Sequence, residues 1–383
     1  MHFACFVPKR QNKEIQLSPS RWLAIFAALA LVAFGVAACG SSDSSSTGGG
    51  GGSGSASGEI AGAGATSQEA AQEAWVAEFE NANADATVTY DAVGSGGGRE
   101  QFIAGGVAFA GSDAALTEEE GELKKAMDRC NPGQLIEIPA YISPIAIIYN
   151  LEGVESLQLS APTLAGIFSQ KITTWNDPAI AKENPGVELP STRITPVNRS
   201  DESGTTENFT EYLSEVDPQG WPYEVSGDWP VKGGEAANGT SGVVEAVAAG
   251  DGAIGYADAS QAGELGVATI KVGSKYEEPT PEAAAAVLEQ SPEAKDLAKT
   301  PYMFPYELDR KTESSGTYPI VLVSYLIGCT EYGSANEAAL VKAYLEYVIS
   351  PEGQEAAASN AGSAPLSSAL TKKIEPAVAA IKG

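Results

Sequence analysis

Short apolar runs rich in β-branched residues alternate with helical patterns along most of this chain. That alternation is typical of an α/β protein, in which helices cover a sheet. The first expected helix spans residues 67–82, because Ala71, Trp75 and Phe79 recur every four residues and would form one buried stripe. The elements expected after it are strands at 87–93 and 107–110 and a short helix at 97–104.

Two long extended segments, residues 134–150 and 318–328, lie near opposite ends of the body of the chain. Pro139 and Pro144 interrupt the first, which fits a strand that passes between two lobes better than a central strand. About 170 residues separate the two segments, enough for an inserted lobe, and the body is longer than one ordinary core. We therefore expect one lobe of residues 59–141 plus 318–383 and a second lobe of residues 142–317.

The N-terminus has the pattern of an export signal over residues 1–38. Basic residues precede an apolar run that ends in Val36-Ala37-Ala38, directly before Cys39. The run is short for a membrane-spanning helix, although an uncleaved signal anchor is the alternative. A cysteine after these small residues resembles a bacterial lipobox, in which the thiol is lipidated. Residues 39–58 are almost wholly Gly, Ser and Ala and predict a flexible tether, so we expect a lipid-anchored protein on the extracytoplasmic face of the cell membrane.

Charge and histidine content exclude several functions. Without the leader, 19 basic and 49 acidic residues give a formal net charge of −30, which argues against nucleic acid and anionic lipid as partners. The single histidine, His2, lies in the leader. Histidine-based triads and histidine-ligated metals are therefore excluded, and we expect no enzyme, no metal and no cofactor. The catalytic alternative is a hydrolase built on Ser203, whose turn offers no lysine partner.

Two cysteines remain in the body, Cys130 and Cys329. In an oxidising compartment they predict one disulfide, and two buried free thiols are the alternative.

Three turns rich in small residues lie between an expected strand and an expected helix. Helix N-termini present unpaired N–H groups and a positive dipole end, and glycine permits close approach of a ligand. Together the three turns predict an anion site, although a Ser or Thr in such a place is commonly only a helix cap. Neither a Walker A loop nor a dinucleotide fingerprint is present. The turns are residues 62–67 (Gly-Ala-Gly-Ala-Thr-Ser), 94–99 (Gly-Ser-Gly-Gly-Gly-Arg) and 199–206 (Arg-Ser-Asp-Glu-Ser-Gly-Thr-Thr).

These turns, in this order, resemble those of the phosphate-binding protein of the high-affinity phosphate ABC transporter, the PstS family. Further matching segments are 111–116 (Gly-Ser-Asp-Ala-Ala-Leu), 166–177 and 252–256, so the likeness extends from Gly62 to about Leu366. The resemblance implies a two-lobed periplasmic-binding-protein type II fold with the ligand in the interlobe cleft. It also implies a monomer that binds inorganic phosphate and docks on the permease subunits of the transporter.

The resemblance also implies a set of ligand contacts. Asp113 would accept a hydrogen bond from a P–OH group, which phosphate retains near neutral pH and sulfate lacks. Asp201 would orient Arg199. From residues alone, Asp113 could instead cap a helix over 114–120. The implied phosphate-binding residues are Thr66, Ser67, Ser95, Asp113, Arg199, Ser203, Gly204 and Thr205.

Two positions depart from the family pattern. Ser67 stands where an aromatic residue is common, and Glu202 stands where a glycine is common. Because a carboxylate in the cleft would oppose an anion, we expect Glu202 to point to solvent. Arg99 is expected at the surface or between the lobes rather than on the ligand. Residues 279–310 match least, and an arsenate binder or a surface adhesin lipoprotein remain the alternatives.

Overall fold

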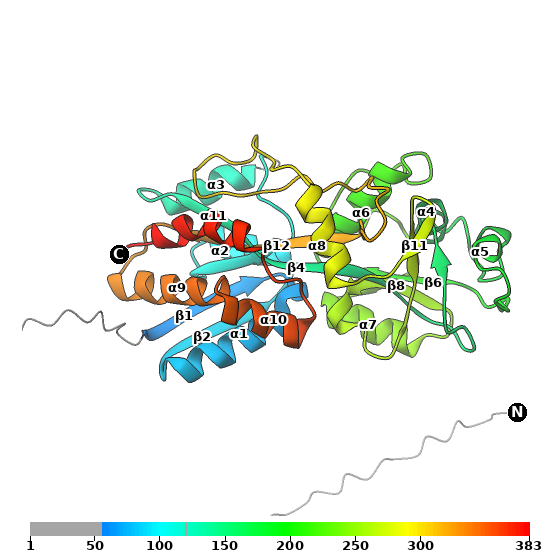
Figure 1. Cartoon of the computed structure of the whole chain (residues 1–383), viewed down its shortest axis with the longest axis horizontal. Helices are drawn as coiled ribbons and strands as arrows, with labels where there is room; N and C mark the ends of the chain where they lie inside the picture. Colours follow the sequence, from blue (N-terminus) through cyan, green and yellow to red (C-terminus); the bar gives the residue numbers. More distant parts are fainter. Residues whose placement is uncertain (1–55, 119–120) are drawn as a thin grey trace, which may run out of the picture. The chain divides into compact units, whose positions relative to one another are not determined.

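A computed structural model of the chain describes residues 56–118 and 121–383 (Figure 1). The expected signal at 1–38 and the expected lipidation site Cys39 lie outside these residues. The helices are η1 (Thr66–Gln68), α1 (Glu69–Ala82), α2 (Ser95–Ile103), α3 (Glu122–Cys130), α4 (Ala161–Phe168), α5 (Pro178–Glu183), α6 (Gly204–Val216), α7 (Gly239–Ala249), η3 (Ala259–Gln261), α8 (Pro281–Gln290), α9 (Ala335–Val348), α10 (Pro351–Ala361) and α11 (Ser368–Ala379). The strands are β1 (Ser57–Gly64), β2 (Asp85–Ala92), β3 (Phe109–Ser112), β4 (Leu135–Asn150), β5 (Gln158–Leu159), β6 (Thr195–Arg199), β7 (Glu235–Ala237), β8 (Ala253–Asp258), β9 (Gly266–Val267), β10 (Thr269–Val272), β11 (Lys275–Glu277) and β12 (Val321–Cys329).

The first helix and the strand after it agree with the sequence patterns, but the strand expected at 107–110 begins two residues later, at Phe109. Residues 67–82 form the end of η1 and all of α1, and Ala71, Trp75 and Phe79 are buried. One limit is corrected: the expected tether ran to Gly58, but β1 already begins at Ser57. Ser57 and Gly58 pair with Asp85 and Ala86 of β2 in parallel register, which orders the end of this glycine-rich segment.

The main sheet has the strand order β2-β1-β3-β12-β4-β8-β6-β7, with β9 added beside β4. Strand β4 changes partner along its length. Residues 135–144 pair antiparallel with β12, and residues 145–150 pair antiparallel with β8. The change falls directly after Pro144, and the prolines that suggested a passing strand lie in the stretch that pairs with β12. β4 thus connects the strand group β1–β3 and β12 with the group β6–β8.

Helices pack on both groups of strands. α2 and α9 contact β1, while α7 contacts β6 and β8, and α8 contacts β4 (Figure 1).

The end of α3 is joined to the end of β12 by a disulfide between Cys130 and Cys329. No helix among residues 56–118 and 121–383 is long and apolar enough to cross a membrane. The sequence limits of the two lobes stay a prediction.

Candidate anion-binding site

All three turns from the sequence lie at strand–helix junctions. The first joins β1 to η1, the second joins β2 to α2, and the third joins β6 to α6. Since β1 runs parallel to β2 and β3, the carboxyl ends of these strands lie at one edge of the sheet. Asp113 directly follows β3 at this edge. The third turn belongs to the other group of strands, so the predicted residues come from both sides of the β4 passage.

Asp113 is the centre of a buried hydrogen-bond cluster and is only 3% exposed. Its Oδ1 accepts from the hydroxyls of Ser67 and Ser324, each at 2.6 Å. Its Oδ2 accepts from Thr205 Oγ1 at 3.0 Å, and its main-chain N–H donates to Ser95 Oγ at 3.1 Å. Burial raises the pKa of Asp113, and the three hydroxyls and the charge of Arg199 offset part of that rise.

Asp113 caps no helix in the described chain. Residues 114–118 are not helical, and α3 begins only at Glu122, after Gly121. The alternative of a helix over 114–120 is therefore wrong for residues 114–118, and the carboxylate is available for other contacts.

The third turn holds a fixed cation. Arg199 is buried, and its Nε donates to Asp201 Oδ1 at 2.8 Å while its second guanidinium nitrogen bonds Oδ2. The N–H of Gly239 also donates to Asp201, at 3.1 Å. Burial pushes the pKa of Asp201 up, but hydrogen bonds and charge from Arg199 outweigh it and hold the pKa below its usual value. The paired carboxylate fixes the direction of the guanidinium, as the resemblance implied for Asp201.

Gly204 lets the N-terminus of α6 approach Asp113. A Cβ added to Gly204 would lie 2.5 Å from Ser95 Oγ and 2.6 Å from Asp113 Cβ, so no larger residue fits without movement. Ser203 caps the helix, because its Oγ accepts from the N–H of Thr206 at 3.2 Å. The start of α6 therefore lies against two residues from the other group of strands.

Thr66 lies against a fourth turn that we did not single out. Its Oγ1 is 2.8 Å from Thr240 Oγ1 and accepts from the N–H of Thr240 at 3.2 Å. Thr240 follows Asn238 and Gly239 at the junction of β7 and α7, so it shares the strand–turn–helix pattern of the other three. Ser324 was also missed, although it is a small polar residue in the apolar run of β12.

The structure thus brings Ser67, Ser95, Gly204 and Thr205 directly around Asp113. The other predicted residues lie in the same turns but bond elsewhere: Arg199 to Asp201, Thr66 to Thr240, and Ser203 within α6.

We expected Glu202 to point to solvent, but the structure pairs its side chain with Arg99. Its Oε1 accepts from Arg99 at 2.5 Å, and its side chain is 38% exposed. Arg99 also donates to Glu122 at 2.9 Å and to Ser112 Oγ at 3.0 Å. The pairing of opposite charges explains the difference: a cation on α2 neutralises the extra carboxylate of the third turn. Arg99 therefore bonds protein carboxylates on both sides, in keeping with a position between the lobes.

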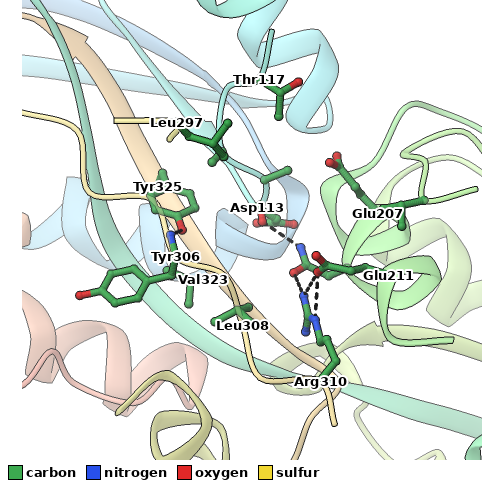
Figure 2. A pocket seen from close by; sticks show the side chains of 14 residues that line it. Asp113, Thr117, Glu207, Glu211, Leu297, Tyr306, Leu308, Arg310, Val323 and Tyr325 are labelled. Carbon is green, nitrogen blue, oxygen red and sulfur yellow. Dashed lines mark hydrogen bonds and ion pairs between the residues drawn. The ribbon is translucent and has the colours of Figure 1, made fainter. Parts of the chain in front are cut away.

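A cavity of about 140 Å³ lies beside Asp113 (Figure 2). Its wall carries Glu207 and Glu211, and burial raises the pKa of Glu207 to about 7. Arg310 faces Glu211 across two hydrogen bonds, of 2.9 and 2.7 Å. This acidic lining is unsuited to an anion, so the cavity adjoins the hydroxyl cluster but does not form its anion-binding part. Within residues 56–118 and 121–383, no group of three or more His, Cys, Asp or Glu side chains is arranged to hold a metal ion.

Comparison with known proteins places the chain within one superfamily. Residues 49–352 match the family model of the PBP superfamily domain. The chain is 36% identical to phosphate-binding protein PstS2 of Mycobacterium bovis (strain BCG / Pasteur 1173P2), over 93% of this chain and 98% of that protein. It is 35% identical, with the same coverage, to phosphate-binding protein PstS 2 of Mycobacterium tuberculosis (strain ATCC 25618 / H37Rv). A solved high-affinity periplasmic phosphate-binding protein (PfluDING) with bound phosphate superposes with a TM-score of 0.69 and 25% identity, over 83% of this chain and 93% of that one. The expected α/β fold, the two-lobed type II periplasmic-binding-protein fold, is confirmed.

Proposed function

This chain belongs to the PstS family of phosphate-binding proteins, and we propose that it captures inorganic phosphate outside the cytoplasm and delivers it to an ABC importer. One observation carries the proposal: a buried carboxylate, Asp113, lies among hydroxyl and helix N-terminal donors that come from both groups of strands. A site with donors alone would hold any oxyanion. A site that also contains a fixed acceptor requires a ligand that still carries a proton.

In the proposed complex, the turns at the helix N-termini and the guanidinium of Arg199 donate hydrogen bonds to phosphate. Arg199, oriented by Asp201, supplies charge, and Asp113 accepts the hydrogen bond of the P–OH group. Sulfate lacks that proton near neutral pH and would leave the buried carboxylate facing a second anion. The Thr205 hydroxyl already donates its proton to Asp113, so Thr205 would donate to the ligand through its N–H. The further donors are Thr66, Ser95, Ser203, Gly204 and the N–H groups of Ser67 and Thr205.

The net negative charge of the chain is compatible with an anionic ligand. Repulsion by surface carboxylates is screened over about 8 Å at physiological salt, whereas the hydrogen bonds of the buried turns act at contact. The excess of acidic residues can slow capture without preventing tight binding.

We further propose that the protein acts as a binding protein and not as an enzyme. The oxygen of Ser203, the nucleophile of the hydrolase alternative, already accepts the N–H of Thr206 as a helix cap. Residues 39–383 contain no histidine that could serve as its base.

Attachment and docking complete the proposal. Lipidation of Cys39 after removal of residues 1–38, with a tether reaching to residue 56, would hold a monomer at the outer face of the membrane. The permease subunits would contact both lobes, with the limits 59–141 plus 318–383 and 142–317. The pattern of residues 36–39 supports the anchor, and the family supports the transporter.

Isothermal calorimetry tests the binding function. The purified protein, stripped of bound anions, is titrated at neutral pH with phosphate and then with sulfate. We expect one-to-one binding of phosphate and no heat from sulfate. A folded sample that takes up neither anion, or both equally, would contradict the proposal.

A further inference from the structure

A chain of buried hydrogen bonds ends on the carboxylate of Asp113. Ser324 of β12 donates to Asp113 Oδ1, and Gln68 Nε2 donates to Ser324 Oγ, both at 2.6 Å. Behind Gln68, the side-chain amide of Gln72 donates to Gln68 Oε1 at 2.8 Å. The hydroxyl of Tyr344 donates to Gln72 Oε1 at 2.7 Å. All five side chains are buried, so water does not compete for these bonds.

The carboxylate of Asp113 determines which group donates and which accepts in each of these hydrogen bonds. An ionised carboxylate can only accept, so the single proton of Ser324 goes to Asp113 and the serine lone pair accepts from Gln68. Gln68 Nε2 also donates to the main-chain oxygen of Tyr325 at 3.2 Å, a group that cannot donate, and this fixes the amide orientation independently. With Gln68 fixed, its oxygen can accept only from the NH₂ of Gln72.

A glycine, Gly111, provides the space for these hydrogen-bonded side chains. A Cβ on Gly111 of β3 would lie 2.9 Å from Gln68 Oε1 and 2.3 Å from the hydroxyl of Tyr90. The segment that carries Asp113 therefore leaves room for the amide that supports it.

We propose that Ser324 is a positioning residue for anion recognition, which together with Gln68, Gln72 and Tyr344 orients the Asp113 carboxylate so that about one acceptor position remains for a proton of the ligand. An ionised carboxylate accommodates about four donors, two on each oxygen. Ser67 and Ser324 occupy Oδ1, and Thr205 takes one position on Oδ2. The remaining position on Oδ2 selects a ligand that offers one O–H group. This inference deepens the proposed function and rests on it for the identity of the ligand.

The first test needs no ligand. In the whole protein with ¹³C-labelled aspartate carboxyls, the Asp113 resonance is identified by its loss in Asp113→Asn and then titrated with pH. Ser324→Ala removes a donor to the charged form, so the pKa of Asp113 should rise by roughly one unit. Ser324→Thr retains the hydroxyl and should restore the original titration. Arg199 and Tyr90, which also interact electrostatically with Asp113, are unchanged in both variants.

The second test measures selectivity by calorimetry. Ser324→Ala should weaken phosphate binding roughly tenfold, the loss of one hydrogen bond to a charged group. Sulfate binding should appear at a higher pH than in the original protein, because a protonated Asp113 can donate to sulfate. The matched control is Ser143→Ala, which removes an equally buried hydroxyl from β4 that bonds Pro144 O and not Asp113.

The outcomes separate the two proposals. An unchanged Asp113 titration in a folded Ser324→Ala variant overturns the positioning role, whatever the ligand. A protein that binds no phosphate overturns the proposed function, while the titration still decides the role of Ser324. If Ser324→Ala does not fold, Gln68→Met, which removes the donor behind the serine, must show a smaller shift in the same direction or the proposal fails.

Discussion

Asn208 of α6 donates from Nδ2 to the main-chain oxygen of Asp113 at 2.8 Å, so a helix from one group of strands is bonded to the acidic loop of the other. The same amide donates to Gly204 O at 2.8 Å, and its oxygen accepts from Arg310, which is fully buried. Arg310 also donates to the carbonyl of Pro319, just before β12, and to that of Val321, its first residue. This contact gives residues 279–310, which fit the family least, a structural role at their last residue.

Replacement of Asn208 by alanine should therefore weaken both the fold and anion binding. The change removes one hydrogen bond each from the guanidinium of Arg310 and from the main-chain oxygens of Asp113 and Gly204. We expect a loss of roughly 1–3 kcal/mol in the free energy of unfolding. Urea unfolding and phosphate calorimetry measure the two effects. The control is Thr210→Val on the same helix, whose buried hydroxyl bonds Glu207 O and Ser226 O. Loss of stability in both variants with affinity unchanged in both would show that the Asn208 contact does not shape the site.

Asp113→Asn should exchange one ligand preference for another. The amide supplies a donor where the carboxylate offered only an acceptor, so we expect weaker phosphate binding and measurable sulfate binding at neutral pH. Competition between the two anions, followed by calorimetry, gives the ratio of their affinities. A variant that still rejects sulfate as completely as the original would place discrimination in another residue.

Gly204→Ala should weaken anion binding more than it weakens the fold. The new methyl group would overlap Ser95 Oγ and Asp113 Cβ, and overpacking of this kind costs roughly 1–3 kcal/mol. Gly242→Ala on α7 is the matched control, since the nearest atom to a Cβ there is Ala237 Cβ, at 3.6 Å. Phosphate affinity should fall for Gly204→Ala alone, and equal affinities for the two variants would contradict a close approach of α6 to Asp113.

Glu137 should make the protein less stable as pH rises towards neutral. Burial raises the pKa of this β4 side chain from 4.5 to about 7, and its Oε2 has no hydrogen-bond partner among the described residues. Because the folded pKa is raised, the stabilisation is fully present below pH 4.5 and is lost as pH rises through about 7. Each pKa unit corresponds to about 1.4 kcal/mol.

Urea unfolding at several pH values between 4.5 and 8 checks this window, which is set by the pKa of Glu137. Glu137→Gln keeps an oxygen for the N–H of Leu116, which Glu137 Oε1 accepts at 2.8 Å, and should flatten the profile. A slope that persists unchanged in the glutamine variant would assign it to other groups, such as Glu207.

Local sequence patterns were sufficient for the first helix, for the two long extended segments and for the turns that hold the donors. The stripe of Ala71, Trp75 and Phe79, and the prolines of β4, are short-range signals with a direct physical meaning. The three turns lie at strand–helix junctions because glycine and hydroxyl residues favour such junctions.

Two contacts, Ser324 with Asp113 and Glu202 with Arg99, could not be predicted in this way. Ser324 is 211 residues from Asp113 in sequence, and Glu202 is 103 residues from Arg99. Neither pair shares an element or a periodicity, so only the folded chain shows that Ser324 donates to the carboxylate and that Glu202 has a cationic partner. A small polar residue within the apolar β12 was the one available signal for the first.

The partner change along β4 has a consequence for the order in which the molecule can assemble. Its first stretch, residues 135–144, and strand β3 both pair with β12, which begins only at Val321. A chain that emerges from the ribosome N-terminus first therefore presents β1–β3 as an unfinished sheet until β12, at residues 321–329, has followed. Long-range pairing of this kind slows folding, so β3 keeps one open edge until the last strand of the sheet has paired with it.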